Sequence, residues 1–329
     1  MKSEKMSIDS QIKIFRILFV SSISLTLIWL MVTLAISSKS RPVKISVWQG
    51  IEGHKKVEAL DTRNRKHLKS MLRCKDSDLK MEILFRGDHW ILQNMISGLR
   101  SRKMGCAEAI TFVTVADFSY LMHLETLVER WMGPISLALF APGDDFYATM
   151  NAIQYARLCL PISKLVRDYV TFHIYFPSGH LPVDGIPRTP LEALKWPANC
   201  SEPYAPYENV RRRDLYWHGL QLGLPINLGR NVARRSINTH YALVADIELY
   251  PSKDFIPQFF DMISRNTSLV TSKNRHVFAV PAFDLDHHAM VPDTKEDLMT
   301  MYNMGMAMEM HHRSCSYCQL IPEEQKWLE

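Results

Sequence analysis

Residues 109–140 read AITFVTVADFSYLMHLETLVERWMGPISLALF, and the order of patterns in this stretch predicts the fold. Ala109–Ala116 is an apolar run of strand length that ends at Asp117. Apolar residues then recur at helical spacing, at Leu121, Leu124, Leu127, Val128 and Trp131. After Gly133-Pro134, Ile135–Phe140 is a second strand run. Strand, helix and strand in this order predict an α/β domain with a mainly parallel sheet.

The same alternation continues on both sides of this stretch. Phe146–Leu160 predicts a helix, and Val170–Phe176 predicts a third strand in which His173 is a core histidine. Residues 81–99 predict a strand followed by an apolar helix. A nucleotide would bind at the carboxyl ends of the strands, which makes Thr114 and Asp117 donor-binding candidates. The sequence contains neither G-x-G-x-x-G nor G-x-x-x-x-G-K-[ST], so neither a dinucleotide fold nor a P-loop is indicated.

Residues 239–252 read THYALVADIELYPS and supply the candidate metal ligands. Tyr241–Ala245 predicts a buried strand, and Asp246 and Glu248 follow it. In an extended chain residues i and i+2 project to the same side, so the two carboxylates would point together. Hard oxygen ligands suit Mn²⁺ or Mg²⁺, which would hold a diphosphate as in a nucleotide-sugar transferase. The alternative is a solvated strand end.

Two helices are predicted just before this strand, over Asn209–Gly223 and Asn227–Arg235. The second carries three donor-binding candidates, Arg230, Asn231 and Arg234. Arg230 and Arg234 are four residues apart and would share a face, where they could pair with phosphate or a sugar carboxylate. The alternative is a pair of arginines on a solvated helix face. Between 177 and 206, a Pro- and Gly-rich stretch predicts a surface loop.

An uncharged run of membrane length lies near the N-terminus. Ile17–Ile36 reads ILFVSSISLTLIWLMVTLAI, and the slight excess of basic residues before it favours a cytoplasmic N-terminus. We predict a cytoplasmic tail over 1–16, a transmembrane signal anchor over 17–36, a stem over 37–80 and a folded luminal domain over 81–329. A cleaved signal peptide is the alternative, although the apolar run is longer than a usual h-region.

Other features fit a luminal address. Asn199 and Asn266 begin N-glycosylation triplets. Six cysteines follow the predicted anchor, and all are disulfide candidates whose pairing the sequence leaves open: Cys74, Cys106, Cys159, Cys200, Cys315 and Cys318. For the last two, with His311 and His312 just before, zinc binding is the alternative to a disulfide. The net charge of +5 is spread along the chain and does not indicate nucleic-acid binding.

Several long blocks in one order resemble glycosyltransferase family 49, the family of LARGE and β-1,4-glucuronyltransferase 1. They include GDHWILQNMI, the stretch from residue 111 to 143, VRDYVTFHIYF, PINLGRNVAR, THYALVADIELYPS and PAFDLDHH. The resemblance implies a GT-A fold in a single-pass type II Golgi membrane protein with a luminal domain, which uses a UDP-sugar and Mn²⁺ and inverts the anomeric configuration. The named members add glucuronic acid to xylose while building matriglycan on α-dystroglycan, in protein O-linked mannosylation. The metal motif falls on Asp246-Ile247-Glu248, with Glu where the vertebrate enzyme has Asp.

This sequence departs from the family after the C-x-x-C at Cys315 and Cys318. In the family the domain continues with an acceptor-binding segment and a histidine that completes the metal shell, whereas this sequence stops at Glu329. We therefore expect a domain that is incomplete at its C-terminus and a catalytic base that the sequence does not identify. Candidate replacement ligands are His287, His288, His311 and His312. Two functions stay open: a metal-dependent glucuronyltransferase acting on a xylose-type glycan acceptor, or an inactive luminal member that binds a partner or glycan.

Overall fold

A computed structural model describes part of the chain: residues 43–47, 68–183, 185–266, 268–271, 275–315, 318, 321–322 and 324–328. Within these ranges no helix combines the length and the apolarity needed to cross a bilayer, and the span predicted over 17–36 lies outside them. The chain forms two compact units, which are Met1–Trp48 with Ser272–Val280, and Gln49–Thr271 with Pro281–Glu329.

The first unit contains two described strands. β1 (Val43–Val47) pairs in parallel with β8 (Arg275–Ala279), so that Val43 lies opposite Arg275 and Val47 opposite Ala279. Five residues of the segment predicted as a stem are therefore in a strand. The last part of that segment belongs to the second unit, where Ser77 N–H donates to Asn238 Oδ1 at 3.0 Å. The described chain of the second unit thus includes residues upstream of the boundary predicted at residue 81.

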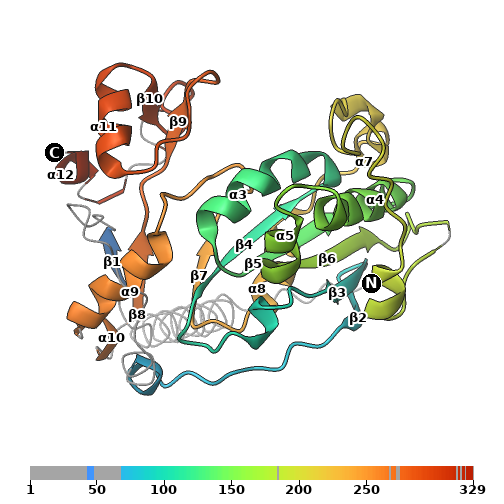
Figure 1. The fold of residues 1–329 in the computed structure, drawn as a ribbon, viewed down its shortest axis with the longest axis horizontal. Coiled ribbons are helices and arrows are strands. Elements are labelled where there is room, and N and C mark those ends of the chain that lie inside the picture. The colour runs from blue at the N-terminus through green and yellow to red at the C-terminus, as the bar shows by residue number, and fades with distance from the viewer. Residues whose placement is uncertain are drawn as a thin grey trace, which may run out of the picture. The chain divides into compact units, whose positions relative to one another are not determined.

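The second unit is built on a six-stranded sheet in the order β2-β3-β6-β5-β4-β7 (Figure 1). Its strands are β2 (Glu82–Arg86), β3 (His89–Ile96), β4 (Ile110–Ala116), β5 (Ile135–Phe140), β6 (Val170–Pro177) and β7 (Tyr241–Val244). The four strands β6, β5, β4 and β7 are parallel, and β3 runs antiparallel to both β2 and β6. The predicted α/β class with a mainly parallel sheet is confirmed, and it fits a GT-A-like domain.

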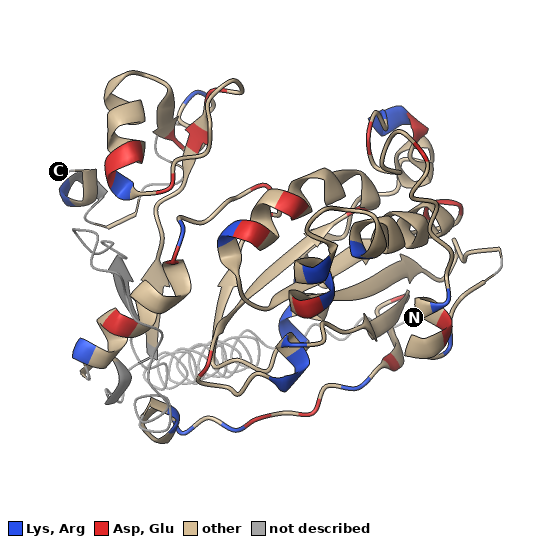
Figure 2. Cartoon of the chain, viewed as in Figure 1, with Lys and Arg blue, Asp and Glu red and all other residues tan. Residues whose placement is uncertain are grey.

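The three central strands are uncharged and buried. Every residue of β4 and β5 is buried, and so is every residue of β6 except its last, Pro177. Figure 2 shows these strands without charged residues, while acidic and basic residues lie on helices, loops and outer segments. Continuous apolar runs of this kind form strands that are covered on both faces, because side chains alternate between the two faces. The three strands predicted from 109 to 176 are confirmed.

Helices cover both faces of this sheet. The helices of the second unit up to residue 271 are α3 (Leu124–Trp131), α4 (Asp145–Leu158), α5 (Ser163–Tyr169), α6 (Pro190–Leu194), α7 (Tyr216–Gly219), α8 (Ile226–Arg235), α9 (Phe255–Arg265) and α10 (Ser268–Thr271). The 3₁₀ helices are η1 (Ser101–Lys103), η2 (Phe118–His123) and η3 (Arg212–Asp214). On one face, Trp131 of α3 meets Phe112 of β4 with ring centroids 5.5 Å apart. On the other, Ser136 Oγ of β5 donates to the carbonyl oxygen of Ala233 in α8 at 2.8 Å.

The contact of α8 with the sheet is close at one glycine. A Cβ atom on Gly229 would lie 2.3 Å from Cγ2 of Val115 and 2.5 Å from the hydroxyl of Tyr175. Heavy atoms cannot approach so closely, so only glycine allows the helix backbone to lie at this depth on β4 and β6. The helix predicted over Asn227–Arg235 is confirmed, and this contact fixes its position over the sheet.

Two predicted helices differ in the structure. The apolar helix expected after residue 81 is instead β3, which forms a hairpin with β2 through Gly87 and Asp88, both at positive φ (52° and 67°). A short apolar run has no periodicity that separates a buried strand from a helix, and the turn decides the outcome. The run Asn209–Gly223 is not one helix but η3 and α7, separated by the extended residue Leu215 (φ −74°, ψ 130°).

A buried carboxylate explains why α7 starts where it does. Asp145, at the first turn of α4, accepts the backbone N–H groups of Tyr216 at 2.9 Å and Trp217 at 3.0 Å. Burial raises the pKa of Asp145, and these two hydrogen bonds oppose the shift. The long-range contact starts a new helix at Tyr216, and no local sequence pattern announces it.

Residues 281–328 of the second unit add a smaller group of elements. They are β9 (Phe283–Leu285), β10 (Ala307–Glu309), α11 (Lys295–Asn303) and α12 (Glu324–Leu328), with β9 and β10 antiparallel. Phe283 and Trp327 lie with ring centroids 5.4 Å apart, and the ammonium group of Lys295 lies 4.9 Å from the Trp327 ring. This cluster packs α12 against the strand and the start of α11.

All six cysteines are paired. The disulfides join Cys74 to Cys106, Cys159 to Cys200, and Cys315 to Cys318. The first ties the segment before β2 to the loop before β4, and the second ties the end of α4 to the loop that carries Asn199. The predicted disulfide between the last two cysteines is confirmed, so the zinc alternative at this pair is wrong.

Candidate functional site

The candidate site lies where the parallel strands end. Asp117 follows β4 directly, and Asp246 follows β7 after one intervening residue. The two strands are neighbours, and beyond their last paired residues the backbone N–H of Ala245 donates to the carbonyl oxygen of Val113 at 3.2 Å. The carboxyl ends of parallel strands share one edge of the sheet, where ligands bind in open α/β folds. The predicted placement of the acid pair at the end of a parallel strand is confirmed.

The strand that carries the acid pair is an edge strand and not a buried one. β7 ends at Val244, and its residues alternate between half-buried and exposed, with Val244 48% exposed. Among the described strands only β4 pairs with it, so one side of β7 lacks the neighbour that would bury it. Prediction of a buried strand over Tyr241–Ala245 is wrong for this reason: a short apolar run does not reveal whether a strand is central or at the edge.

The two carboxylates are separated by a turn. After Asp246 the chain turns at Ile247 and Glu248, and Leu249 N–H donates to the carbonyl oxygen of Asp246 at 3.0 Å. The i, i+2 rule for strands therefore does not govern Asp246 and Glu248, because it requires an extended chain. Ile247 is buried at 1% exposure, whereas Asp246 is half-buried and Glu248 exposed. The buried isoleucine anchors the turn and leaves both acids accessible.

One ion pair brings two predicted site residues together. Arg230 Nη2 of α8 contacts Oδ1 of Asp246, and the two side chains are 37% and 39% exposed. The register explains the contact, because Val244 lies opposite Val113, which places Asp246 about level with Val115. Val115 is the residue against which Gly229 packs, so the next residue of α8 reaches the acid. Arg230 Nε is buried and has no hydrogen-bond partner in the described residues.

The other predicted donor-binding residues lie in two different environments. Asn231 and Arg234 are exposed on α8. Thr114 is fully buried between β5 and β7, and its Oγ1 has no hydrogen-bond partner in the part of the chain that the structure describes. Asp117 is 1% exposed and caps η2, accepting from Ser119 N–H at 2.8 Å and Ser119 Oγ at 2.5 Å. Both side chains are buried, so neither is accessible to a donor in this structure.

A histidine and a tyrosine that sequence reasoning missed lie beside Glu248. His123, at the end of η2, and Tyr250 share a hydrogen bond of 2.7 Å between Nδ1 and the hydroxyl. Burial lowers the pKa of His123, and the negative charge of Glu248 opposes this shift. Burial also raises the pKa of Tyr250, and Glu248 adds to that increase. The sequence signal was the position of Tyr250 two residues after Glu248, but nothing local indicated His123, which lies 127 positions away from Tyr250.

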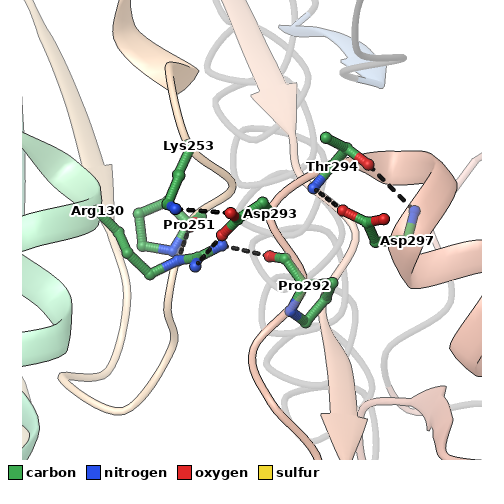
Figure 3. A network of polar contacts seen from close by, with 7 residues as sticks. All are labelled: Arg130, Pro251, Lys253, Pro292, Asp293, Thr294 and Asp297. Atoms are coloured by element: carbon green, nitrogen blue, oxygen red, sulfur yellow. Dashed lines mark hydrogen bonds and ion pairs between the residues drawn. The ribbon is translucent and has the colours of Figure 1, made fainter.

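The loop after the acid pair is held by a buried arginine (Figure 3). Arg130 of α3 donates from Nε to the carbonyl oxygen of Pro251 at 2.8 Å and from Nη1 to Asp293 Oδ1 at 2.8 Å. Its Nη2 donates to the carbonyl oxygen of Pro292. Lys253 Nζ contacts the second carboxylate oxygen of Asp293 at 2.6 Å, and these two partners hold the pKa of Asp293 below its usual value. We refer to Arg130, Pro251, Lys253, Pro292 and Asp293 as the Arg130 network.

The Arg130 network continues into α11. Thr294, the residue after Asp293, caps that helix by accepting from Asp297 N–H at 3.1 Å, while Thr294 N–H donates to Asp297 Oδ2 at 3.2 Å. This reciprocal capping box fixes the start of α11. Arg130 therefore connects three separate segments: α3, the loop that follows Glu248, and the segment before α11.

The carboxylate groups of Asp246 and Glu248 are suitable ligands for a divalent cation. Mg²⁺ and Mn²⁺ are commonly held by one or two carboxylates together with substrate phosphates, and Asp246 and Glu248 are two accessible carboxylates beside a predicted phosphate-binding arginine. Within the described residues no three His, Cys, Asp or Glu side chains gather as a metal cluster. The candidate replacement histidines are exposed on the β9–β10 segment, where His287 lies 3.5 Å from Asp286 and His312 lies 3.5 Å from Glu309.

Neutral polar groups are buried in the middle of the parallel strands and toward their amino ends. His173 is fully buried, accepts the N–H of Asn94 on Nδ1 at 2.8 Å, and shares a 2.9 Å hydrogen bond between Nε2 and Ser136 Oγ. Burial lowers the pKa of His173 to about 3, so it is neutral and structural, as predicted. A cavity of about 20 Å³ lies beside Ser136, at the amino end of the strands, and is also lined by Thr111 and Thr171. It is only large enough for a water molecule.

Comparison with known proteins places this site in a family. Residues 109–329 match the family model described as glycosyl-transferase for dystroglycan. The chain is 30% identical over 222 residues to beta-1,4-glucuronyltransferase 1 of Danio rerio, across 67% of this chain and 49% of the relative. It is 28% identical over 222 residues to the Homo sapiens protein of the same name, across 67% of this chain and 51% of the relative.

A second group of relatives is more distant. The chain is 24% identical over 200 residues to xylosyl- and glucuronyltransferase LARGE2s of Danio rerio, across 60% of this chain and 20% of the relative. The chain thus spans about half the length of the glucuronyltransferases it matches, and one fifth of the longer relative. These matches confirm the resemblance seen in the sequence, and the family model covers the strands β4–β7, α8 and the acid pair.

Proposed function

This chain belongs to the family of glycosyl-transferases for dystroglycan, and from this premise we propose that it transfers glucuronic acid from a UDP-sugar to a glycan acceptor ending in xylose. Two relatives support the choice of sugar, because one is named for glucuronyl transfer and the other for both xylosyl and glucuronyl transfer. The xylose-ended acceptor follows from the family resemblance of the sequence. The reaction would be metal-dependent and would invert the anomeric configuration.

The observation that carries the proposal is the contact between Arg230 and Asp246 at the carboxyl end of the parallel strands. The contact brings the guanidinium of α8 and the accessible carboxylate that follows β7 to one point. The second acid, Glu248, is two residues further along the chain. A nucleoside diphosphate carries negative charge that requires both an arginine and a divalent cation. The amino end of α8 also lies near this edge, where Tyr175 hydroxyl donates to the carbonyl oxygen of Pro225 at 3.5 Å. Helix amino ends attract phosphate through free N–H groups.

The residues would divide the work as follows. Asp246 and Glu248 would hold Mn²⁺ or Mg²⁺, which when bound supplies charge neutralisation for the departing diphosphate. Arg230 would pair with a diphosphate oxygen, and Arg234, one helical turn further on the exposed face, would face the rest of the donor. His123 and Tyr250, which are bonded to each other and within the field of the Glu248 charge, would line the rim beside that acid. No described residue is assigned as the base that takes the acceptor hydroxyl proton.

We extend the proposal to the location of the folded domain, which we place in the lumen of the Golgi behind a single membrane anchor. Three disulfides support an oxidising compartment, because such bonds persist in the secretory pathway and are rare in the cytosol. Both glycosylation acceptors are on the surface, since Asn199 and Asn266 are exposed. Glycosidase treatment of the chain expressed in animal cells should lower its apparent mass, and Asn199→Gln with Asn266→Gln should remove that change.

Titration calorimetry with UDP and Mn²⁺ tests the proposed donor site. The chain should bind UDP in the presence of Mn²⁺, and Asp246→Ala should weaken that binding at least about tenfold, as loss of a metal ligand does. Glu296→Ala is the matched control, because it removes an equally negative, exposed side chain on α11, away from the sheet. Equal UDP affinity in both variants would remove the donor site from Asp246.

A second candidate is a family member that binds nucleotide or glycan without transferring sugar. The observation in its favour is that Arg230 already neutralises Asp246, the carboxylate that the cation requires. In that case UDP would bind with the same affinity in EDTA as in Mn²⁺, and purified chain incubated with UDP-glucuronic acid and xylose-terminated acceptor would release no UDP. Cation-dependent binding together with UDP release would instead establish the transferase.

A further inference from the structure

The strand at the far edge of the sheet from the acid pair is exposed and apolar. β2 is the terminal strand in the order of the sheet, and among the described strands only β3 pairs with it. Ile83 is 44% and Phe85 is 55% exposed, and they project to the same side because they are two residues apart in a strand. Trp90, which lies opposite Phe85 on β3, is 37% exposed, and the two rings have centroids 5.0 Å apart.

Among the described residues, the backbone of β2 also presents hydrogen-bonding groups without a partner strand at this edge. The hairpin closes with Arg86 opposite His89 around the two-residue turn Gly87-Asp88. The two residues that flank such a turn exchange backbone hydrogen bonds. Along the strand, the N–H and C=O groups of successive residues then point alternately toward the partner strand and away from it. Glu82, Leu84 and Arg86 therefore direct their N–H and C=O groups toward β3. The same groups of Ile83 and Phe85 face outward, and such an edge is a template for another strand.

The sequence of β2 is complementary to itself. It reads EILFR, with an acid at one end, a base at the other and Leu84 in the middle. Two copies placed antiparallel about a twofold axis at Leu84 would put Glu82 of each opposite Arg86 of the other. The same register puts Ile83 opposite Phe85, so that the outward-facing backbone groups of both residues meet their counterparts. One register therefore pairs the opposite charges, brings the apolar side chains into contact and forms the backbone hydrogen bonds.

We propose that β2 is the interface through which two copies of this chain associate, joining their sheets edge to edge by antiparallel pairing centred on Leu84. A twofold interface is isologous, and a strand whose ends carry opposite charges is self-complementary in that arrangement. The partner is therefore a second copy of this chain. The site proposed for the donor lies at β7, the other terminal strand, so association would leave it open.

Cysteine cross-linking tests the register in the full chain. Leu84→Cys places a thiol on the proposed twofold axis, where the two Cα atoms would be about 4.5 Å apart, within disulfide reach. Ile83→Cys is the matched control, because its own symmetry copy would be roughly 8–9 Å away, too far for a disulfide. The six native cysteines are all paired, so each variant has one unpaired thiol. We expect a covalent dimer on non-reducing gels at least fivefold more abundant for Leu84→Cys.

Charge reversal tests the pairing independently of any thiol. Glu82→Arg and Arg86→Glu should each raise the dimer dissociation constant about tenfold in sedimentation velocity, because each creates two like-charge contacts. The double variant Glu82→Arg/Arg86→Glu restores both opposite-charge pairs and should return the constant to within about twofold of the wild-type value. All four positions are exposed or half-exposed, and unchanged melting temperatures would verify folding. Equal cross-linking at residues 83 and 84, cross-linking only to other proteins, or a double variant as weak as the single ones would overturn the proposal.

Discussion

The two ends of the parallel strands carry polar groups of opposite character. Toward the amino end, Ser136 and its mid-strand partner His173 are buried and neutral, and each forms hydrogen bonds inside the protein. At the carboxyl end, Asp246 and Arg230 are charged, both more than a third exposed, and the buried Nε of Arg230 has no partner within the described residues. A polar group that is satisfied internally stabilises the fold, whereas an accessible charge is available to a ligand. The difference indicates which end of the sheet is built for binding.

The largest expected effect is at the carboxyl end. Asp246→Asn keeps the shape of the side chain and removes its charge, so sugar transfer should fall at least about 100-fold, equivalent to about 3 kcal/mol of transition-state stabilisation. The free energy of unfolding should change by less than about 1 kcal/mol, because the ion pair lost is partly exposed. UDP release from UDP-glucuronic acid and urea unfolding measure the two effects. A variant with normal turnover would show that the carboxyl end is no more functional than the amino end.

The next largest effect is on stability and arises at the Arg130 network. Arg130→Met retains much of the side-chain volume but leaves Asp293 and the carbonyl groups of Pro251 and Pro292 without their donor. We expect the free energy of unfolding to fall by about 3 kcal/mol, as for a buried charged group that loses its partner. Lys253→Met is the control: it contacts the same Asp293 but is 57% exposed, and it should cost under about 1 kcal/mol. Equal losses in the two variants would mean that burial of Arg130 contributes nothing.

The third effect is a difference in UDP binding between variants of two arginines on α8. Arg230→Ala should raise the dissociation constant for UDP about tenfold, since a charge-assisted hydrogen bond contributes roughly 1.5 kcal/mol or more. Arg234→Ala, on the exposed side of α8, should change it less than about threefold. Calorimetry in the presence of Mn²⁺ measures both. If Arg234→Ala has the larger effect, the donor lies over the exposed face and not beside Asp246.

The smallest effect is the pH dependence of the free energy of unfolding that arises from His173. The pKa of His173 is lowered from 6.5 to about 3 by burial, so below pH 6.5 the unfolded chain takes up a proton that the folded chain does not. The stability due to neutral His173 is therefore present above pH 6.5 and is lost as the pH falls toward 3; between pH 7 and pH 5.5 the loss is about 1 kcal/mol. His173→Gln offers an acceptor to Asn94 and a donor to Ser136 but does not titrate. Urea unfolding at the two pH values should show a smaller pH dependence in this variant.

Much of the fold could be predicted because its signals are local. The runs from Ile110 to Pro177 are uncharged, of strand length and separated by helical spacing, so their identity and order follow from periodicity. The predictions that were wrong concern elements whose structure depends on contacts with residues far away in the sequence. The strand at residues 89–96 is fixed by the turn at Gly87 and by pairing with β6, and α7 begins at Tyr216 because Asp145, 71 positions upstream, accepts its N–H. No window of neighbouring residues contains that information.

The candidate site shows the same limit. Asp246, Glu248 and Arg230 could be identified from their own segments, because an acidic motif after an apolar run and an arginine on a predicted helix are local patterns. The contact between Arg230 and Asp246 also required the packing depth of Gly229 on Val115. His123 and Arg130 come from elements before β5, and only the fold brings them to the loop that follows Glu248.

The ion pair between Arg230 and Asp246 would couple the binding of the two proposed ligands, the cation and the diphosphate. A cation that takes the carboxylate releases the guanidinium, and a diphosphate that takes the guanidinium releases the carboxylate. Each ligand thus removes the competitor of the other, and because coupling between two binding equilibria is reciprocal, each should increase the affinity for the other by the same factor. If the proposed donor site is correct, the protein that holds donor and cation together would be favoured over the protein that holds either one alone.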